Sequence, residues 1–487
     1  MKDLIIDCFA GGGASVGIEM ALGRPVDIAI NHDPDAILMH KTNHPNTLHL
    51  TEDIFKVDLK KYVKGRHVAL MWASPDCTSH SKAKGGKPRE KGLRILPWAV
   101  YKHAKAILPD VILMENVEEI QQWGPLDSNG HPIKERRGED YRKFIMAMKS
   151  LGYMFECREL IAADYGAPTT RKRWYAIFRR DGREIVWPAP THFKDREPRW
   201  KACGDYIDWS DFGRSIFDRP KPLADATMKR IANGIRKYIV ENPNPYIVKD
   251  GEKLFLSYLD KAYGGNYKGC GSDLHSPCST ITTVDHNRLV TAFLIQYHGE
   301  TKAGDSRGQF LTEPINTSNR YGLVTAFITK YYKTGIGQGC DEPLHTITTS
   351  PGHFGLISAF LIKYYGSGGS CQGIDRPLDT ITTKDRFGLV NVVLDIQGEK
   401  YILKDIFLRM LKPEELKLMQ GFPKDYIIDR DYNWKPYPIA KQVARIGNSV
   451  VPIMAEKLVE ANCSYLKVGE RVPNLNINDS QEQLRFA

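Results

Sequence analysis

The chain has 487 residues, of which 42% are hydrophobic and 26% charged, and its Lys and Arg residues exceed Asp and Glu by 10. This composition excludes a disordered or fibrous chain and is typical of a globular protein with more than one domain. The positive balance favours an acidic partner such as nucleic acid. The nine cysteines are never spaced as Cys-x-x-Cys, so we expect no disulfide framework, no metal site and a reducing compartment.

Strands and helices are predicted to alternate over the first 180 residues. Apolar runs rich in β-branched residues predict strands at 4–9, 26–30, 68–73, 111–114, 154–160 and 174–178. Helical patterns lie at 98–108 and 141–151, and Ser15 is expected to cap a helix after the first strand. This order indicates an α/β fold with a mostly parallel sheet covered on both faces. Ligands of such folds bind beyond the carboxyl ends of the strands, so we expect the chemistry there.

A glycine-rich turn follows the first strand, with Gly11, Gly12 and Gly13 in succession. Glycines let the backbone approach a ligand closely at the start of a helix. A dinucleotide fingerprint would place its third glycine at Val16, and the next glycine is Gly17, which weakens a nicotinamide interpretation. A tight turn without a ligand is the alternative.

Chemically capable side chains follow three further strands. Cys77 lies just past a strand, before a basic loop that favours its thiolate, and is placed to act as a nucleophile. Glu115 ends an apolar strand, where a carboxyl group can hold or donate a proton. Arg171 and Arg173 alternate on an extended segment and present two guanidinium groups on one side. Each signal alone has an ordinary structural alternative: a buried cysteine, an acid near a helix start, or a charged strand edge.

Six segments occur together in a characteristic order: Asp7-x-Phe9-x-Gly11-x-Gly13, Pro75-Asp76-Cys77, Glu115-Asn116-Val117, Arg171-x-Arg173, Gln420-Gly421-Phe422-Pro423 and Gly447-Asn448-Ser449-Val450. In this order they resemble the motifs of the DNA (cytosine-5)-methyltransferases, over about residues 1–185 and 400–465. The resemblance implies a Rossmann-like domain that depends on S-adenosylmethionine. Two positions depart from the family: its usual Pro-Pro-Cys-Gln is Pro75-Asp76-Cys77-Thr78 here, and the glutamine before its paired arginines is Thr169.

The resemblance also implies a role for each matching residue. Cys77 would be the covalent nucleophile, Glu115 would engage cytosine N3 and Arg173 would orient the base, with Arg171 as a further catalytic candidate. The cofactor would be bound by Asp7, Phe9, Ala10, Gly11, Gly13, Asp33, Asp53, Ile54, Pro75, Asn448 and Val450. The loop after Cys77 would close over the flipped base and its phosphates, with Ser81, Lys82, Lys84 and Lys87 on DNA.

The middle of the chain repeats itself. Similar segments centre on Leu289, Leu323, Leu356 and Leu389, which are 34, 33 and 33 residues apart. Their threonine, aromatic and β-branched residues predict short strands. In position, this region matches the family's target-recognition domain, so we expect a β-rich recognition domain with internal repeats, and a structural insertion is the alternative. Arg288, Arg320 and Arg386 precede three of the copies and are candidates for reading bases, although exposed turns also drift in this way.

The expected domains are a catalytic domain at 1–185 and 396–467, a target-recognition region at 186–395, and a polar tail at 468–487. We expect a DNA (cytosine-5-)-methyltransferase that methylates C5 of cytosine at a specific sequence in duplex DNA. Its expected setting is the cytoplasm of a bacterial or phage-infected cell, as a monomer in a restriction-modification system beside a separate cognate endonuclease, without membrane contact. A tRNA cytosine-5 methyltransferase and a catalytically inert DNA-binding protein on the same fold remain as alternatives.

Overall fold

The computed structural model describes residues 3–76, 94–221, 223–251, 253–263, 267, 269–296 and 399–468, and short strands between 327 and 396. The chain divides into two compact units, Met1–Arg199 with Gln420–Ala487, and Trp200–Met419. Each unit is considered by itself. Within the described part of the chain, no helix combines the length and the apolar character needed to cross a membrane.

The first unit is built on a seven-stranded sheet with the order β3-β2-β1-β4-β5-β7-β6. The strands are β1 (Leu4–Cys8), β2 (Ile28–Asn31), β3 (Leu48–Thr51), β4 (Val68–Ala73), β5 (Val111–Asn116), β6 (Met154–Ile161) and β7 (Lys172–Arg179). Strands β1 to β5 pair in parallel, and β7 runs antiparallel to both β5 and β6. The predicted mostly parallel sheet is therefore confirmed.

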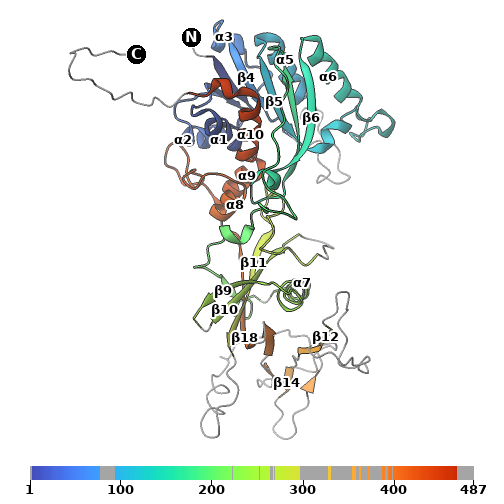
Figure 1. The fold of residues 1–487 in the computed structure, drawn as a ribbon, viewed down its shortest axis with the longest axis vertical. Coiled ribbons are helices and arrows are strands. Elements are labelled where there is room, and N and C mark those ends of the chain that lie inside the picture. Colours follow the sequence, from blue (N-terminus) through green and yellow to red (C-terminus); the bar gives the residue numbers. More distant parts are fainter. Residues whose placement is uncertain are drawn as a thin grey trace, which may run out of the picture. The chain divides into compact units, whose positions relative to one another are not determined.

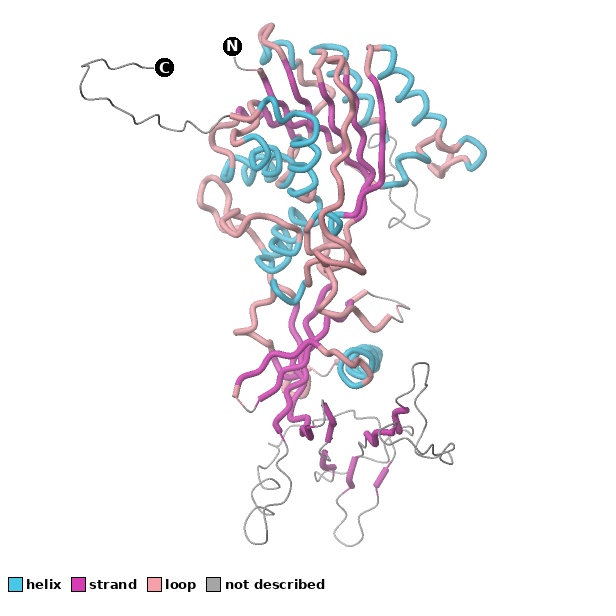
Figure 2. The backbone as a smooth tube through the Cα atoms, in the orientation of Figure 1, coloured by secondary structure: helices cyan, strands magenta, loops and turns pink. Residues whose placement is uncertain are grey.

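Helices cover both faces of this sheet (Figures 1 and 2). The helices of this unit are α1 (Gly13–Leu22), α2 (Pro34–Asn43), α3 (Leu59–Val63), α5 (Leu96–Ile107), α6 (Glu139–Ser150), α9 (Ile439–Asn448) and α10 (Pro452–Cys463), with short turns of helix at Glu118–Gln122, Lys134–Arg136, Ala162–Tyr165 and Ser464–Leu466. One core contains Ile18 of α1 and Leu458 of α10, and the other contains Val100 of α5 and Phe144 of α6. The predicted strands and helices agree with this order. The edge strand β3 was not predicted, because its sequence Leu-His-Leu-Thr is short and largely exposed.

The second unit contains an antiparallel sheet with the order β17-β18-β11-β10-β9, and β8 also pairs with β18. Its described elements include β8 (Arg214–Ser215), α7 (Asp225–Ile235), a π-helical turn (Arg236–Val240), β9 (Tyr246–Asp250), β10 (Lys253–Lys261), β11 (Asn287–Gln296), β17 (Val393–Ile396), β18 (Glu399–Met410) and α8 (Pro413–Met419), with a 3-10 turn at Cys203–Tyr206. One sheet face packs on Ile231 and Ile239 through Leu254, Leu256 and Val290. Strand β10 is buried on both faces from Leu254 to Lys261, which accounts for apolar residues at consecutive positions of this strand.

Among the described residues, strands lie within the first, third and fourth repeat copies. The first copy forms β11, and the third and fourth contribute β13 (Phe354–Ile357) and β16 (Phe387–Leu389). The remaining short strands are β12 (Phe327–Lys330), β14 (Leu361–Lys363) and β15 (Cys371–Gln372), while Leu323 of the second copy lies outside the described residues. The interpretation of the repeats as a recognition domain stays a prediction.

The two units divide later in the chain than the expected boundaries at 185 and 395. Residues just after 185 belong to the first unit, where Val186 N donates to Asn462 Oδ1 and Trp187 Nε1 donates to Glu156 Oε2. Residues after 395 belong to the second unit because β18 pairs with β11 over most of its length. Hydrogen bonds of the residues that follow positions 185 and 395 decide to which unit these residues belong, and composition does not reveal such bonds.

Replacing Gly17 by alanine is expected to destabilise the first unit. A Cβ atom at Gly17 would lie 2.2 Å from Pro452 O and 2.8 Å from Glu456 N, both backbone atoms of α10. Overpacking of this kind costs about 1–3 kcal/mol, because α1 and α10 must separate. A lower melting temperature in calorimetry checks the prediction. Gly11→Ala is the matched control, since nothing lies within 4 Å of the added Cβ. Equal melting temperatures for Gly17→Ala and the wild type would contradict this packing.

Candidate functional site

Polar side chains tie neighbouring strand ends together at the carboxyl edge of the parallel strands. Asn31 ends β2 and donates from Nδ2 to Ala10 O at 2.9 Å. Asn116 ends β5 and donates from Nδ2 to Pro75 O at 3.0 Å. Neither asparagine was predicted as a site residue, although Asn116 lies between Glu115 and Val117 in one of the six motifs. They fix the glycine-rich turn after β1 and the segment after β4 relative to the sheet.

The glycine-rich turn has one open side and one packed side. Phe9 is in the left-handed region with a φ of 64°, which turns the chain sharply after β1. A Cβ atom at Gly13 would lie 1.8 Å from Val450 O, so only glycine lets the segment around Val450 approach this closely. A Cβ atom at Gly11 would meet nothing within 4 Å. The turn thus offers open space at the start of α1, where backbone N–H groups favour an anionic group.

Asp7 lies fully buried at the end of β1, beside the start of this turn. Burial raises the pKa of its carboxyl group to about 7, and the hydrogen bond from Ser15 opposes that rise. Ser15 Oγ donates to Asp7 Oδ2 at 2.7 Å. The prediction that Ser15 caps α1 is therefore wrong: Gly12 occupies the N-cap position, and the Ser15 hydroxyl group satisfies the buried carboxyl group. Asp7 Oδ1 is buried and has no hydrogen-bond partner among the described residues.

Glu115 and the paired arginines meet where β5 and β7 lie side by side. Arg173 Nε lies 3.2 Å from Glu115 Oε1, and both side chains are almost buried. Arg171 Nη1 donates instead to Gly447 O at 3.0 Å, next to Asn448 at the end of α9. The two arginines therefore differ in role: Arg173 faces the carboxylate, and Arg171 holds the segment from Gly447 to Val450.

The predicted cofactor acids lie in different surroundings. Asp33 caps α2 by accepting from Asp35 N at 2.9 Å and also pairs with Arg445 Nη2 at 2.5 Å. These two partners already engage its carboxylate, and Asn31 Oδ1 accepts from Asp33 N at 2.9 Å. Asp53 is exposed and accepts from Phe55 N at 2.9 Å, while the adjacent Ile54 is buried.

Several predicted site residues lie outside the described residues: Cys77, Ser81, Lys82, Lys84, Lys87, Arg320 and Arg386. Pro75 and Asp76 are the last described residues before Cys77. Arg288 of the second unit is described, and its Nε donates to Asp260 Oδ2 at 2.9 Å. Arg230 Nε donates to the other oxygen of Asp260 at 2.8 Å. Since Asp260 is fully buried, it holds Arg288 firmly, and base reading by Arg288 stays a prediction.

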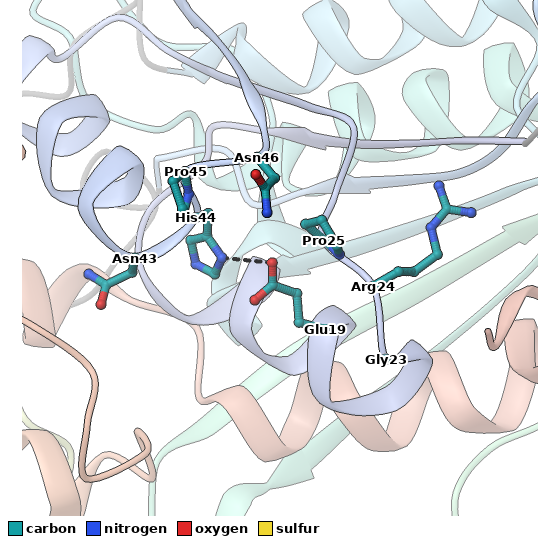
Figure 3. A pocket seen from close by; sticks show the side chains of 8 residues that line it. All are labelled: Glu19, Gly23, Arg24, Pro25, Asn43, His44, Pro45 and Asn46. Carbon is teal, nitrogen blue, oxygen red and sulfur yellow. Dashed lines mark ion pairs between the residues drawn. The ribbon is translucent and has the colours of Figure 1, made fainter. Parts of the chain in front are cut away.

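A pocket of about 270 Å³ lies away from this edge of the sheet (Figure 3). It is lined by Glu19, Gly23, Arg24, Pro25, Asn43, His44, Pro45 and Asn46. These residues come from the ends of α1 and α2, and His44 Nδ1 lies 3.0 Å from Glu19 Oε1. In a parallel α/β unit each helix runs back toward the amino edge of the sheet. The pocket therefore does not belong to the candidate site.

Asp7→Asn is expected to change how stability depends on pH. The carboxyl group has an ordinary pKa of 3.8 and a folded pKa of about 7, so the folded chain binds the proton more tightly. That contribution to stability is fully present below the ordinary pKa and is lost as pH rises through about 7. The wild type should therefore lose stability relative to Asp7→Asn between about pH 5 and pH 8, as melting temperatures would show.

Asp35→Asn is the matched control for this comparison. The hydrogen bond from Lys441 lowers the pKa of Asp35, so this group stays ionised over the same range. Its effect on melting temperature should be constant. A constant difference for Asp7→Asn as well would contradict the burial of a protonated carboxyl group.

Comparisons with known proteins find similarity to DNA methylases. The family model for C-5 cytosine-specific DNA methylases matches residues 4–243. Type II methyltransferase M.AquIA of Picosynechococcus is 27% identical over 207 residues, covering 41% of this chain and 81% of that protein. Type II methyltransferase M1.HphI of Haemophilus parahaemolyticus is 29% identical over 212 residues, covering 42% of this chain and 51% of that protein, so the match spans about half of this relative.

Among solved structures, the Dnmt2 methyltransferase of S. pombe is 14% identical with a TM-score of 0.43, over 96% of this chain and 98% of that one. A similarity at this level adds no argument about function. The family model and the curated relatives carry the assignment. Residues 4–243 are therefore identified as a domain of the C-5 cytosine-specific DNA methylase family.

Proposed function

We propose that this chain transfers a methyl group from S-adenosylmethionine to C5 of a flipped cytosine in duplex DNA, through a covalent adduct with Cys77. The observation that carries the proposal is the pairing of Glu115 with Arg173 at the ends of β5 and β7. Asn116, the neighbour of Glu115, holds the Pro75 carbonyl group, so this pair lies on the same hydrogen-bonded framework as the segment that leads to Cys77.

The chemistry requires a nucleophile and an electrostatic partner at the same base. Cytosine C5 becomes nucleophilic only after a thiolate adds to C6, and the charge that develops is stabilised by a proton or hydrogen bond at N3. Cys77 supplies the thiolate and Glu115 supplies the hydrogen bond. After methyl transfer the C5 proton leaves, the C5–C6 double bond re-forms and the Cys77 thiolate is expelled. A stacked base is inaccessible to these groups, so the cytosine must be flipped out of the duplex.

The residues of the glycine-rich turn fit S-adenosylmethionine. When bound, this cofactor supplies an electrophilic methyl group on a sulfonium cation. The start of α1 suits its carboxylate, and the open space at Gly11 leaves room for its amino-acid end. The unpartnered oxygen of buried Asp7 places negative charge nearby when the carboxyl group is ionised. Arg171 positions the segment around Asn448 and Val450 that borders the turn.

We further propose that the second unit selects the DNA sequence and that a separate restriction endonuclease is the partner in the cell. Supporting this, the relatives M.AquIA and M1.HphI are both type II methyltransferases. Since the family model and these relatives concern DNA methylases, neither tRNA methylation nor an inert DNA-binding role is favoured. Bisulfite sequencing of plasmid DNA from cells expressing the chain tests the proposal. A parallel assay measures transfer of a labelled methyl group from S-adenosylmethionine to DNA and to tRNA. Unmethylated plasmid, with the label found on tRNA or on neither nucleic acid, would contradict the proposal.

Cys77 is expected to form a covalent bond to DNA that carries 5-fluorocytosine, because fluorine at C5 prevents the final elimination. A denaturing gel should show an adduct that depends on S-adenosylmethionine and disappears in Cys77→Ser. Cys157→Ser is the control, since Cys157 is a free, partly exposed cysteine of the same unit. An adduct that survives Cys77→Ser would disprove the assignment of the nucleophile.

Glu115→Gln is expected to slow methyl transfer by about 10²–10⁴-fold, the usual contribution of a positioned acid or base. Its effect on DNA binding should be much smaller, because the interaction strengthens as charge develops at N3. Single-turnover rates and DNA titrations separate the two effects. Glu159→Gln is a control on β6, which lies on the other side of β7 and where the carboxylate pairs with Lys172. A loss below about tenfold for Glu115→Gln would argue against its role.

A further inference from the structure

A continuous chain of hydrogen-bonding side chains joins Asp7 to the edge of the first unit. Ser15 Oγ lies 2.7 Å from Asp7 Oδ2 and 2.9 Å from His40 Nε2. His40 Nδ1 lies 2.8 Å from His49 Nε2. Asp7, Ser15 and His40 are fully buried, and His49 lies partly exposed on the edge strand β3. The chain thus crosses the unit from β1 through α1 and α2 to β3.

Two arrangements of protons satisfy every link in this chain. In the first, protonated Asp7 donates to Ser15, Ser15 donates to His40 Nε2, and His40 donates from Nδ1 to His49 Nε2. In the second, every donor is reversed: His49 donates to His40, His40 donates to Ser15, and Ser15 donates to the Asp7 carboxylate. Each histidine ring permits either tautomer, so the chain can change from one arrangement to the other without moving a heavy atom.

The surroundings keep the histidines neutral while Asp7 titrates. Burial lowers the pKa of His40 well below its usual range and lowers the pKa of His49 to about 4. A backbone hydrogen bond at Thr47 favours a proton on His49 and partly opposes that fall. Among these four hydrogen-bonded side chains, Asp7 is therefore the group that gains or loses a proton near neutral pH.

Five other titratable groups surround this row of hydrogen-bonded side chains: Cys8 on β1, Glu19 on α1, Lys41 and His44 at the end of α2, and Tyr426. Burial raises the pKa of the Cys8 thiol and of the Tyr426 phenol, so both stay neutral. His44 pairs with Glu19 and stacks on His40 with ring centroids 4.4 Å apart. The Coulombic effects of His44 and Lys41 also lower the pKa of His49, which keeps His49 neutral.

We propose that Asp7, Ser15, His40 and His49 form a proton relay, through which Asp7 releases a proton to solvent when a cation binds at the glycine-rich turn. The proposal rests on the proposed function, which makes that cation S-adenosylmethionine. The Asp7 proton moves to Ser15 Oγ, the Ser15 proton to His40 Nε2, and the His40 Nδ1 proton to His49 Nε2. His49 then releases its Nδ1 proton to water, so one proton leaves and the Asp7 carboxylate remains. The ionised Asp7 attracts the bound cation more strongly than the neutral acid does.

A pH-jump infrared experiment on the ligand-free full chain tests the relay itself. The band of a protonated carboxyl group that is absent in Asp7→Asn reports the protonation of Asp7. We expect this band to respond at least about tenfold more slowly in Ser15→Ala and in His49→Gln than in the wild type, because the proton path is broken. His131→Gln, which changes an exposed histidine elsewhere in the unit, should respond like the wild type. His49→Gln replaces a partly exposed side chain and so guards against a buried Ser15→Ala variant that fails to fold.

Unchanged kinetics in Ser15→Ala and His49→Gln, or no carboxyl band assignable to Asp7, would overturn the relay. Calorimetry of S-adenosylmethionine binding near pH 7, in buffers of different ionisation enthalpy, tests its coupling to the cofactor. The wild type should release a fraction of a proton for each ligand bound, and Asp7→Asn should release correspondingly less. Equal release by both proteins overturns the coupling. If no S-adenosylmethionine binds, the proposed function fails, and the infrared result still decides whether the relay exists.

Discussion

The hydrogen bonds at the carboxyl ends of the central strands determine where this protein can do chemistry. Strands β1, β4 and β5 are buried along their whole length, so the polar groups at their ends must form hydrogen bonds within the protein instead of with water. Asn31, Asn116 and Ser15 satisfy those groups with short bonds between neighbouring segments. The rigidity of the site is thus a result of the need to satisfy buried polar groups.

This constraint also separates side chains that look equivalent in the sequence. Arg171 and Arg173 are alternate residues at the start of β7, yet one holds the Gly447 carbonyl group and the other faces Glu115. Asp33 was expected to bind the cofactor, and it stabilises the start of α2 and pairs with Arg445. A carboxylate with two such partners contributes first to the arrangement of its own segment. Arg171 and Asp33 each have a partner on α9, which is far away in the sequence.

The sequence predicted the strands of the first unit because their apolar runs are long and interrupted by clear turns. It also placed the glycine-rich turn and Glu115 at one edge, since parallel strands bring their carboxyl ends together. Arg173 lies at this edge because the antiparallel strand β7 begins there. It did not reveal the links that depend on distant contacts, such as Asn116 to Pro75 or His40 to His49. His40 and His44 share a helix face at a spacing of four residues, but only the fold shows that His49 and Ser15 meet them. The capping role expected for Ser15 failed for the same reason, because its actual partner Asp7 lies on another element.

The close packing of α1 against α10 has a consequence for biosynthesis. The first unit is assembled from both ends of the described chain, and Gly17 of α1 touches the backbone of α10. Until the ribosome has released α10, the apolar side chains Ile18 and Leu22 of α1 lack their cover. A nascent or truncated chain would therefore expose an apolar surface to chaperones and proteases. The first unit can therefore complete this core only after α10 has been synthesised.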